Sequence, residues 1–375
     1  MAVNVFVPKF HTDEILNEIK ICLEKGWTGL GFKTVEFENA WKEYSKLKNA
    51  HFINSSTAGL HLAVSLFKRK YGWNDGDEII ATPLTFVSSN HAILYERLKP
   101  VFADIDEYLC LDPEDIEQKI TEKTKAVMYV GMGGNTGKLD EVVNLCKKYN
   151  LKLILDAAHM AGTTYKGKHI GNNADVVIFS FQAVKNLPTA DSGMICFKDD
   201  ELDKEVRQAT WLGISKDTYA RFNTSERSYN WEYNVPELGY KYHGNSVIAS
   251  IGLVQLKYLD EDNAQRRAIA EKYTQALTGN DNIELIPIHP ECVPSRHLYQ
   301  ISVENRNHVM DCFYKSDIFP GVHYNINTKY PMYEYGWGTC PKAEAYSDSL
   351  ISLPLHLNLS EDDINHVIDT LKNAL

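Results

Sequence analysis

A lysine and an acid each follow a segment that is typical of a buried strand. Lys185 lies within residues 179–193 (FSFQAVKNLPTADSG), directly after the apolar run Val176–Phe179, and Asp156 follows the alternating segment Leu151–Leu155. A lysine amine is a nucleophile and, once neutral, a base, whereas a carboxylate can hold a protonated nitrogen. If the two strand ends face one pocket, the pair could act on a single ligand.

A possible anion site lies upstream, where a short strand leads into small hydroxyl residues and then a helix. The segment His51–Gly59 reads HFINSSTAG, and the helix is predicted over Leu60–Tyr71. Free amides at a helix N-terminus, with the hydroxyls of Ser56 and Thr57, could hold a phosphate. The alternative is that Ser56 or Thr57 only caps the helix.

Strands and helices alternate through the first half of the chain. Alternation of this kind predicts a mainly parallel sheet covered on both faces by helices, with ligands bound at the carboxyl ends of the strands. The Ser56 turn, Phe86, Asp156 and the loop 180–185 could therefore converge. Strands are predicted at 78–83, 101–106, 125–130, 151–155 and 176–179, and helices at 13–25, 34–45, 60–71 and 139–148, with a further helix starting near 84–90.

The second half of the chain predicts a connection to a smaller unit. Residues 201–224 are helical and then irregular, and a long helix over 247–259 continues to residue 277. Strands follow at 298–303 and 322–324, and helices at 310–314 and 361–371. We therefore expect a large domain of residues 1–250 and a smaller α+β domain of residues 251–375, joined by the long helix.

Composition limits the class of protein. The chain has 375 residues and a net charge of −11, which argues against binding to nucleic acid or to anionic membranes, because both need concentrated positive charge. The seven cysteines are scattered without metal-ligand spacing, so we expect reduced thiols and no metal site. Without a long apolar segment or a targeting signal, a soluble cytoplasmic protein is expected.

A lysine, an acid from another strand end, an aromatic residue and an anion site together suit pyridoxal 5′-phosphate (PLP). Lys185 would form the Schiff base, Asp156 would keep the pyridine nitrogen protonated, and the helix start would hold the phosphate. Phe86, near the start of a helix, could pack on the ring or lie in the core. The alternative for Lys185 is an ordinary solvated loop lysine.

Eight motifs, taken in order, resemble the DegT/StrS-type sugar aminotransferases, which are PLP-dependent transferases of fold type I. The resemblance covers essentially the full length and implies a large domain with a seven-stranded, mainly parallel sheet flanked by helices. The motifs are Asn54–Leu60, Thr85–Val87, Lys99–Asp106, Asp156–His159, Phe179–Lys185, Gly239–Tyr242, Gly252–Leu256 and Ser352–Pro354.

The resemblance also implies roles for cofactor-binding residues. Lys185 would be the Schiff-base lysine and the proton carrier, and Asp156 would pair with the pyridine nitrogen. His159 would lie near the phenolic oxygen of the cofactor, and Phe86 would stack on its ring. Ser180 would hold the phosphate together with the Ser56–Thr57 pair.

Two further residues imply a shared site. Lys241 and His243 correspond to family positions that reach the cofactor phosphate of the neighbouring subunit, which implies a homodimer with shared active sites. The alternative for His243 is a solvated loop histidine.

The resemblance implies transfer of an amino group from L-glutamate, through the pyridoxamine 5′-phosphate form, to a nucleotide-linked keto-deoxysugar. Such an enzyme would act in amino-sugar and polysaccharide biosynthesis, such as that of lipopolysaccharide O-antigen. The motif Gln182–Lys185 is closer to enzymes that aminate C4 than C3. Two alternatives are a PLP-dependent sugar dehydratase, in which histidine replaces the lysine, and a non-catalytic regulatory protein of the same fold.

The chain departs from the family pattern at several places. Ser56–Thr57 replaces a common Gly-Thr, and His323–Asn327 differs from the common His-Tyr-Pro-Pro. The sugar therefore does not follow from the motifs, because loops that bind substrates vary most.

Overall fold

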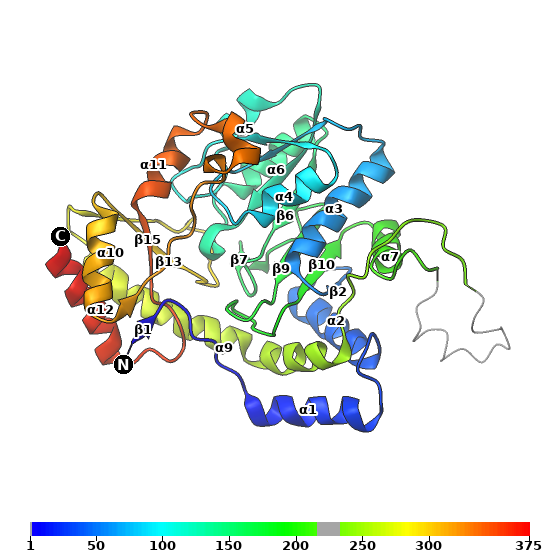
Figure 1. The fold of residues 1–375 in the computed structure, drawn as a ribbon, viewed down its shortest axis with the longest axis horizontal. Coiled ribbons are helices and arrows are strands. Elements are labelled where there is room, and N and C mark those ends of the chain that lie inside the picture. The colour runs from blue at the N-terminus through cyan, green and yellow to red at the C-terminus, as the bar shows by residue number, and fades with distance from the viewer. Residues whose placement is uncertain (1, 216–232) are drawn as a thin grey trace.

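A seven-stranded sheet forms the centre of the structure, a computed structural model that describes residues 2–215 and 233–375 (Figure 1). The strand order is β2-β10-β9-β6-β5-β3-β4. Every neighbouring pair is parallel except for β10, which is antiparallel to both β2 and β9. The predicted mainly parallel sheet is thus confirmed. The strands are β2 His51–Ile53, β3 Glu78–Ala81, β4 Lys99–Phe102, β5 Thr124–Val130, β6 Lys152–Asp156, β9 Val176–Ser180 and β10 Gly193–Phe197.

Helices cover both faces of this sheet, as the two-residue period of β5 shows. Ala126 and Met128 pack into one apolar cluster, and Val127 and Tyr129 pack into another. Successive side chains of a strand point to opposite faces, so both faces of the sheet are buried. The helices before and between these strands are α1 Thr12–Glu24, α2 Phe32–Ser45, α3 Ser56–Tyr71, α4 Ser88–Tyr95, α5 Pro113–Lys119 and α6 Leu139–Lys148, and α7 Asp200–Ala209 follows β10.

Helix α3 begins earlier than its apolar pattern predicts. Its N-cap is Ser55, whose Oγ accepts a hydrogen bond of 3.1 Å from the amide of Ala58. The interpretation of Ser56 or Thr57 as the cap is therefore wrong, and both residues belong to the first turn. A Cβ on Gly59 would lie 2.5 Å from Ile53 Cδ1, so glycine is needed where α3 meets the sheet.

A single long helix, α9 Ser246–Leu277, crosses beneath the central sheet and reaches the C-terminal part of the molecule (Figure 1). Its N-cap is Asn245, whose side chain accepts a hydrogen bond of 2.9 Å from the amide of Ile248. The long helix predicted over 247–277 is thus confirmed as one continuous helix of 32 residues. Its first half packs against α1 and α2, and its second half enters the C-terminal core.

The C-terminal part has its own antiparallel sheet and its own apolar core. Strands β11 Ile283–Leu285, β13 Tyr299–Val303 and β15 Leu350–Leu353 form the sheet, and α10 Arg306–Lys315 packs against α12 Glu361–Ala374. This core also contains Val3, because β1 Val3–Asn4 pairs in parallel with β14 Ile318–Phe319. The N-terminus is thus attached to the C-terminal part. The division into domains at residue 250 stays a prediction.

Shorter elements complete the described chain. A small antiparallel sheet consists of β7 Thr164–Tyr165, β8 Lys168–His169 and β12 Cys292–Val293. The remaining helices are α11 Pro341–Ser349 and the 3-10 turns η1 Met132–Gly134, η2 Asn327–Lys329 and η3 Pro331–Gly336.

Two points of the sequence interpretation concern the later segments. The strand predicted over Val322–Tyr324 is wrong: these residues form a loop next to one bridge between Gly321 and Ser352. The irregular part predicted up to Thr224 falls partly in 216–232, outside the described residues. Among the described helices, none has the length and hydropathy needed to cross a lipid bilayer.

Candidate active site

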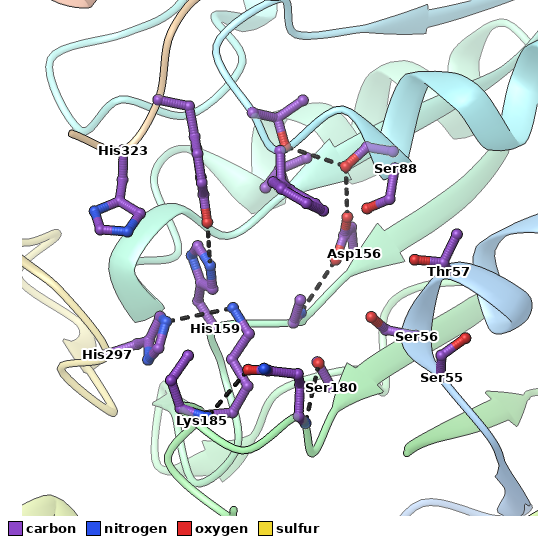
Figure 2. Close-up of a pocket in the computed structure, with 18 of the residues that line it drawn as sticks. Ser55, Ser56, Thr57, Ser88, Asp156, His159, Ser180, Lys185, His297 and His323 are labelled. Carbon is purple, nitrogen blue, oxygen red and sulfur yellow. Dashed lines mark hydrogen bonds between the residues drawn. The ribbon is translucent and has the colours of Figure 1, made fainter. Parts of the chain in front are cut away.

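A cavity of about 440 Å³ opens at the carboxyl ends of β6 and β9 (Figure 2). Ligand sites of parallel sheets are expected at this edge. Most of the predicted site residues meet there although they come from separate elements. The cavity is lined by Ser56, Thr57, Phe86, Asp156, His159, Ser180 and Lys185.

Lys185 lies in a turn after β9, fixed by a hydrogen bond of 2.8 Å from its own amide to the carbonyl of Gln182. Its Nζ lies 3.3 Å from Nε2 of His297. Burial lowers the pKa of Lys185 to about 8, although the charge of Asp156 acts in the opposite direction. Near physiological pH, the neutral fraction of the Lys185 amine is therefore larger than that of an exposed lysine.

Asp156 is the last residue of β6, and both of its carboxylate oxygens are held. Ser89 Oγ donates to Oδ2 at 2.8 Å, and the amide of Ala158 donates to Oδ1 at 3.1 Å. Burial raises the pKa of Asp156, whereas these two hydrogen bonds and the charge of Lys185 oppose the rise. The carboxylate is thus oriented by donors from two different elements.

His159 is held as a neutral ring in one tautomer. The amide of Gly133 lies 3.3 Å from Nδ1, and because an amide can only donate, Nδ1 accepts. The ring hydrogen is then on Nε2 and is donated to Tyr324 Oη at 3.0 Å. Burial, followed by the charges of Lys185 and His323, holds the pKa of His159 well below its ordinary value.

The anion site has two walls. One is the first turn of α3, where helix amides lack intrahelical partners and the hydroxyls of Ser56 and Thr57 line the cavity. The other is Ser180, the last residue of β9, which pairs with Gly193 of β10. A Cβ on Gly193 would lie 2.6 Å from Phe179 O and 3.0 Å from the Ser56 amide, so only glycine lets the two walls come this close.

Phe86 stands at the rim of the cavity. Its side chain is 57% exposed, and its ring centroid lies 5.9 Å from that of Tyr324. An apolar ring left this exposed beside a cavity is available to a flat ligand. The core interpretation of Phe86 does not fit this exposure.

Lys241 and His243 do not line this cavity. Their segment is attached to the end of β2, where the amide of Asn54 donates to the carbonyl of Tyr242 at 2.8 Å. Lys241 Nζ lies 3.1 Å from the ring centroid of Trp211, and the His243 ring is 4.6 Å from that same indole. That Lys241 and His243 reach the cofactor phosphate of a neighbouring subunit stays a prediction.

The cavity is also lined by residues that were not predicted, among them Phe6, Ser89, His297 and Tyr324. Ser89 belongs to the helix start that was recognised near Phe86, so its place on the same turn could have suggested it. Phe6 and His297 carry no local signal, because they reach the cavity only through the docking of the N-terminus and the C-terminal part. Tyr324 lies in the segment His323–Asn327, whose likeness to the family pattern could have suggested it.

These residues fit PLP. A half-buried amine and an oriented carboxylate share one cavity, and helix amides with three hydroxyls form a separate anion site. When bound, PLP supplies an electron sink for chemistry at an amine-bearing carbon. Lys185 would hold the cofactor and move a proton at its Nζ, and Asp156 would face the pyridine nitrogen. Ser56, Thr57 and Ser180 would hold the phosphate.

Fold and site together define a PLP-dependent transferase of fold type I. The model of the DegT/DnrJ/EryC1/StrS aminotransferase family matches residues 10–372, and the chain therefore belongs to this family of sugar aminotransferases. The family is PLP-dependent.

Known proteins are similar over nearly the whole chain. The spore coat polysaccharide biosynthesis protein SpsC of Bacillus subtilis is 33% identical, over 96% of this chain and 94% of SpsC. The aminotransferase TlmJ of Streptoalloteichus hindustanus superposes with a TM-score of 0.91 at 30% identity, over 99% of this chain and 98% of TlmJ. The PLP form of Spr1654 from Streptococcus pneumoniae has a TM-score of 0.89 at 29% identity, over 100% of this chain and 98% of Spr1654.

Proposed function

We propose that this sugar aminotransferase moves an amino group from L-glutamate to a nucleotide-linked keto-deoxysugar, with C4 favoured over C3 as the carbon that is aminated. The observation that carries the proposal is the placement of Lys185 and Asp156 in one cavity beside the first turn of α3. The amine can form a Schiff base with a carbonyl group and be released from it by another amine. The carboxylate can stabilise a protonated nitrogen, and the helix start can hold a phosphate.

The lining of the cavity also suits a sugar. Hydroxyl side chains such as Thr85, Ser88 and Ser192 line it, and so does the amide of Gln182. Groups of this kind can both donate and accept hydrogen bonds, as sugar hydroxyls require. Burial lowers the pKa of His323 to about 4, so this histidine also lines the cavity as a neutral hydrogen-bonding group.

The direct test is a transamination assay with purified protein, PLP, L-glutamate and a panel of nucleotide-linked 3-keto and 4-keto sugars. The expected products are 2-oxoglutarate and a nucleotide-linked amino sugar, in amounts that match one to one. NMR of the sugar product gives the aminated carbon. Lys185→Ala should abolish both products and the visible absorption of the lysine-bound cofactor.

Two outcomes would favour the alternatives. A deoxygenated keto sugar formed without an amino group would indicate a dehydratase, although the retained Lys185 speaks against it. Cofactor binding without conversion of the cofactor by glutamate in a single turnover would indicate a regulatory protein. Product at C3 alone would contradict the preference for C4.

The shared active site is proposed on the positions of Lys241 and His243, which lie outside the cavity of their own chain. Two inactive variants, Lys185→Ala and the double variant Lys241→Ala/His243→Ala, should complement each other when they are refolded together. In a random mixture of dimers, about one quarter of the sites then combine unaltered residues from both chains. If the residues acted within one chain, the mixture would stay inactive.

A further inference from the structure

His297 contacts Lys185 from a distant part of the chain. The two residues are 112 positions apart, and Nε2 of the histidine lies 3.3 Å from Nζ of the lysine. Figure 2 shows the amine directed at His297, which enters the cavity from the loop before β13. His297 is 1% exposed, so it is as deeply buried as the core.

The tautomer of His297 follows from a chain of buried hydrogen bonds. Asn186 Nδ2 donates to the backbone carbonyl of Ser295 at 2.7 Å, and a carbonyl can only accept. The oxygen of the Asn186 amide therefore faces His297 Nδ1, at 3.1 Å. Nδ1 must donate this hydrogen bond, so Nε2 of the neutral ring carries a lone pair toward Lys185.

The orientation of Asn186 is itself fixed by α9. Asn263 Oδ1 accepts from Asn186 Nδ2 at 2.7 Å, and Asn263 Nδ2 donates to the carbonyl of Ala161 at 2.9 Å. Two backbone carbonyls thus determine both amide orientations. Asn186 and Asn263 are 2% and 1% exposed, which keeps water from competing for these hydrogen bonds.

The plane of the imidazole is fixed as well. Phe6 stacks on it, with ring centroids 5.2 Å apart and an angle of 8° between the planes. His159 packs nearby, with its centroid at 4.4 Å. The ring can therefore neither turn over nor tilt without breaking contacts with the N-terminal segment and with the loop after β6.

The charges around the pair favour a neutral histidine. Burial, and then the charge of Lys185, hold the pKa of His297 well below its ordinary value, with smaller effects in the same direction from His159, Arg266 and His323. Lys185 itself is faced by Asp156, whose charge favours the ammonium form. A proton on Lys185 therefore stays on the lysine, and His297 contributes only an acceptor.

We propose that His297 is a positioning residue that holds the released amine of Lys185 and stabilises it while it carries a proton. Lys185 Nζ takes up a proton at one carbon and delivers it to a different carbon, as amino transfer requires, so the amine ends in the neutral form in which it began. Its hydrogen bond to Nε2 persists in both states. No proton moves to His297. The proposal rests on the proposed role of Lys185 as the proton carrier.

The test measures the amine directly in cofactor-free enzyme. Lys185 is labelled with acetic anhydride over a range of pH, and labelling is quantified by mass spectrometry of its peptide relative to the exposed Lys123. His297→Phe keeps a flat ring against Phe6 but removes the acceptor. The ammonium form then loses a buried partner, so the midpoint of Lys185 labelling should move to lower pH while that of Lys123 stays unchanged.

Rescue separates positioning from packing. His297→Gln places an amide near the position of Nε2 and should move the midpoint back toward wild type. His297→Leu gives a second variant without an acceptor if phenylalanine does not fit, and thermal unfolding confirms that each variant is folded. A wild-type midpoint in a folded His297→Phe or His297→Leu variant, or equal shifts in the Gln and Phe variants, would overturn the proposal.

The loaded enzyme gives a second readout. His297→Phe should lower kcat by about 10-fold, the loss expected for one hydrogen bond to a charged group, with little change in KM for the sugar. Failure of the proposed function looks different: the wild-type enzyme would then form no amino sugar, whereas the labelling midpoints, measured without cofactor, would still show whether His297 stabilises the amine. An unshifted labelling midpoint together with an inactive Lys185→Ala would refute only the role of His297.

Discussion

Ser89 donates a hydrogen bond of 2.8 Å to Asp156, and this contact connects the first turn of α4 to the end of β6. Thr85 lies 3.1 Å from the same hydroxyl, so the donor is itself held in place. The carboxylate that faces the cavity is thus oriented by a helix that follows a different strand. Its orientation is a tertiary property, although its identity is evident from the sequence.

Removing the charge of Asp156 should reduce turnover without preventing cofactor loading. Asp156→Asn keeps the shape but cannot stabilise a protonated nitrogen, so kcat should fall by about 100-fold or more. Ser89→Ala loses only the orienting hydrogen bond and should cost about 10-fold. Asp106→Asn, at a buried aspartate outside the cavity, is the control and should leave kcat unchanged. Steady-state kinetics at saturating substrates measure all three.

Covalent loading of the cofactor should depend on pH through Lys185. Only the neutral amine attacks, and burial has lowered the pKa of this lysine from 10.5 to about 8. The loading rate should therefore rise with pH and level off above about 8, instead of rising through pH 10 as it would for an exposed lysine.

Asp156, whose charge acts on Lys185, provides a check that the loading curve reports the protonation of this lysine. The charge of Asp156 stabilises the ammonium form, so Asp156→Asn should move the midpoint of the loading curve to lower pH. Stopped-flow absorbance over pH 6 to 10, a range of about two units on either side of the midpoint, measures both curves. A curve that continues to rise at the alkaline end would contradict a half-buried, reactive amine.

A negative charge in the first turn of α3 should have opposite effects on the helix and on the cofactor. Thr57→Glu places a carboxylate at the positive end of the helix dipole and should stabilise the cofactor-free protein by about 0.3 to 1 kcal/mol. The same charge repels a phosphate, so PLP affinity should fall by about 10-fold or more. Thr57→Gln has the same size without the charge and should show neither effect. Thermal unfolding without cofactor and a PLP titration give the two readouts, and tight PLP binding by Thr57→Glu would place the phosphate elsewhere.

Gly193 should tolerate no side chain. A Cβ there would lie 2.6 Å from a backbone carbonyl and 3.0 Å from the Ser56 amide, and backbone atoms cannot move aside without displacing β9 or α3. Gly193→Ala should lower the free energy of unfolding by about 2 to 4 kcal/mol and weaken PLP binding. Gly29→Ala is the matched control, because its Cβ would meet nothing within 4 Å and its φ is not positive. Denaturant unfolding compares the two, and equal stabilities would show that the sheet can open at this point.

The strand prediction over Val322–Tyr324 was incorrect because the local residue pattern there resembles a strand. Val322 and Tyr324 flank a polar residue, which is the alternation of a strand. The loop is instead held by contacts distant in sequence, among them the hydrogen bond of 2.7 Å from Gln300 Nε2 to the carbonyl of His323. Tyr324 also contacts His159 at 3.0 Å. Tertiary contacts thus override a local pattern of three residues.

The sequence by itself determined the parallel sheet, the carboxyl-edge positions of Asp156 and Lys185, and the run of hydroxyl residues where β2 leads into α3. Each depends on a local pattern, because apolar periodicity defines a strand and the next residues define its end. Only the tertiary structure decided which donor orients Asp156, that His297 faces Lys185, and that Phe6 fixes the imidazole. Those contacts arise when α9, the C-terminal sheet and the N-terminal strand dock on the central sheet, and no local spacing encodes the docking of residues that are more than a hundred positions apart.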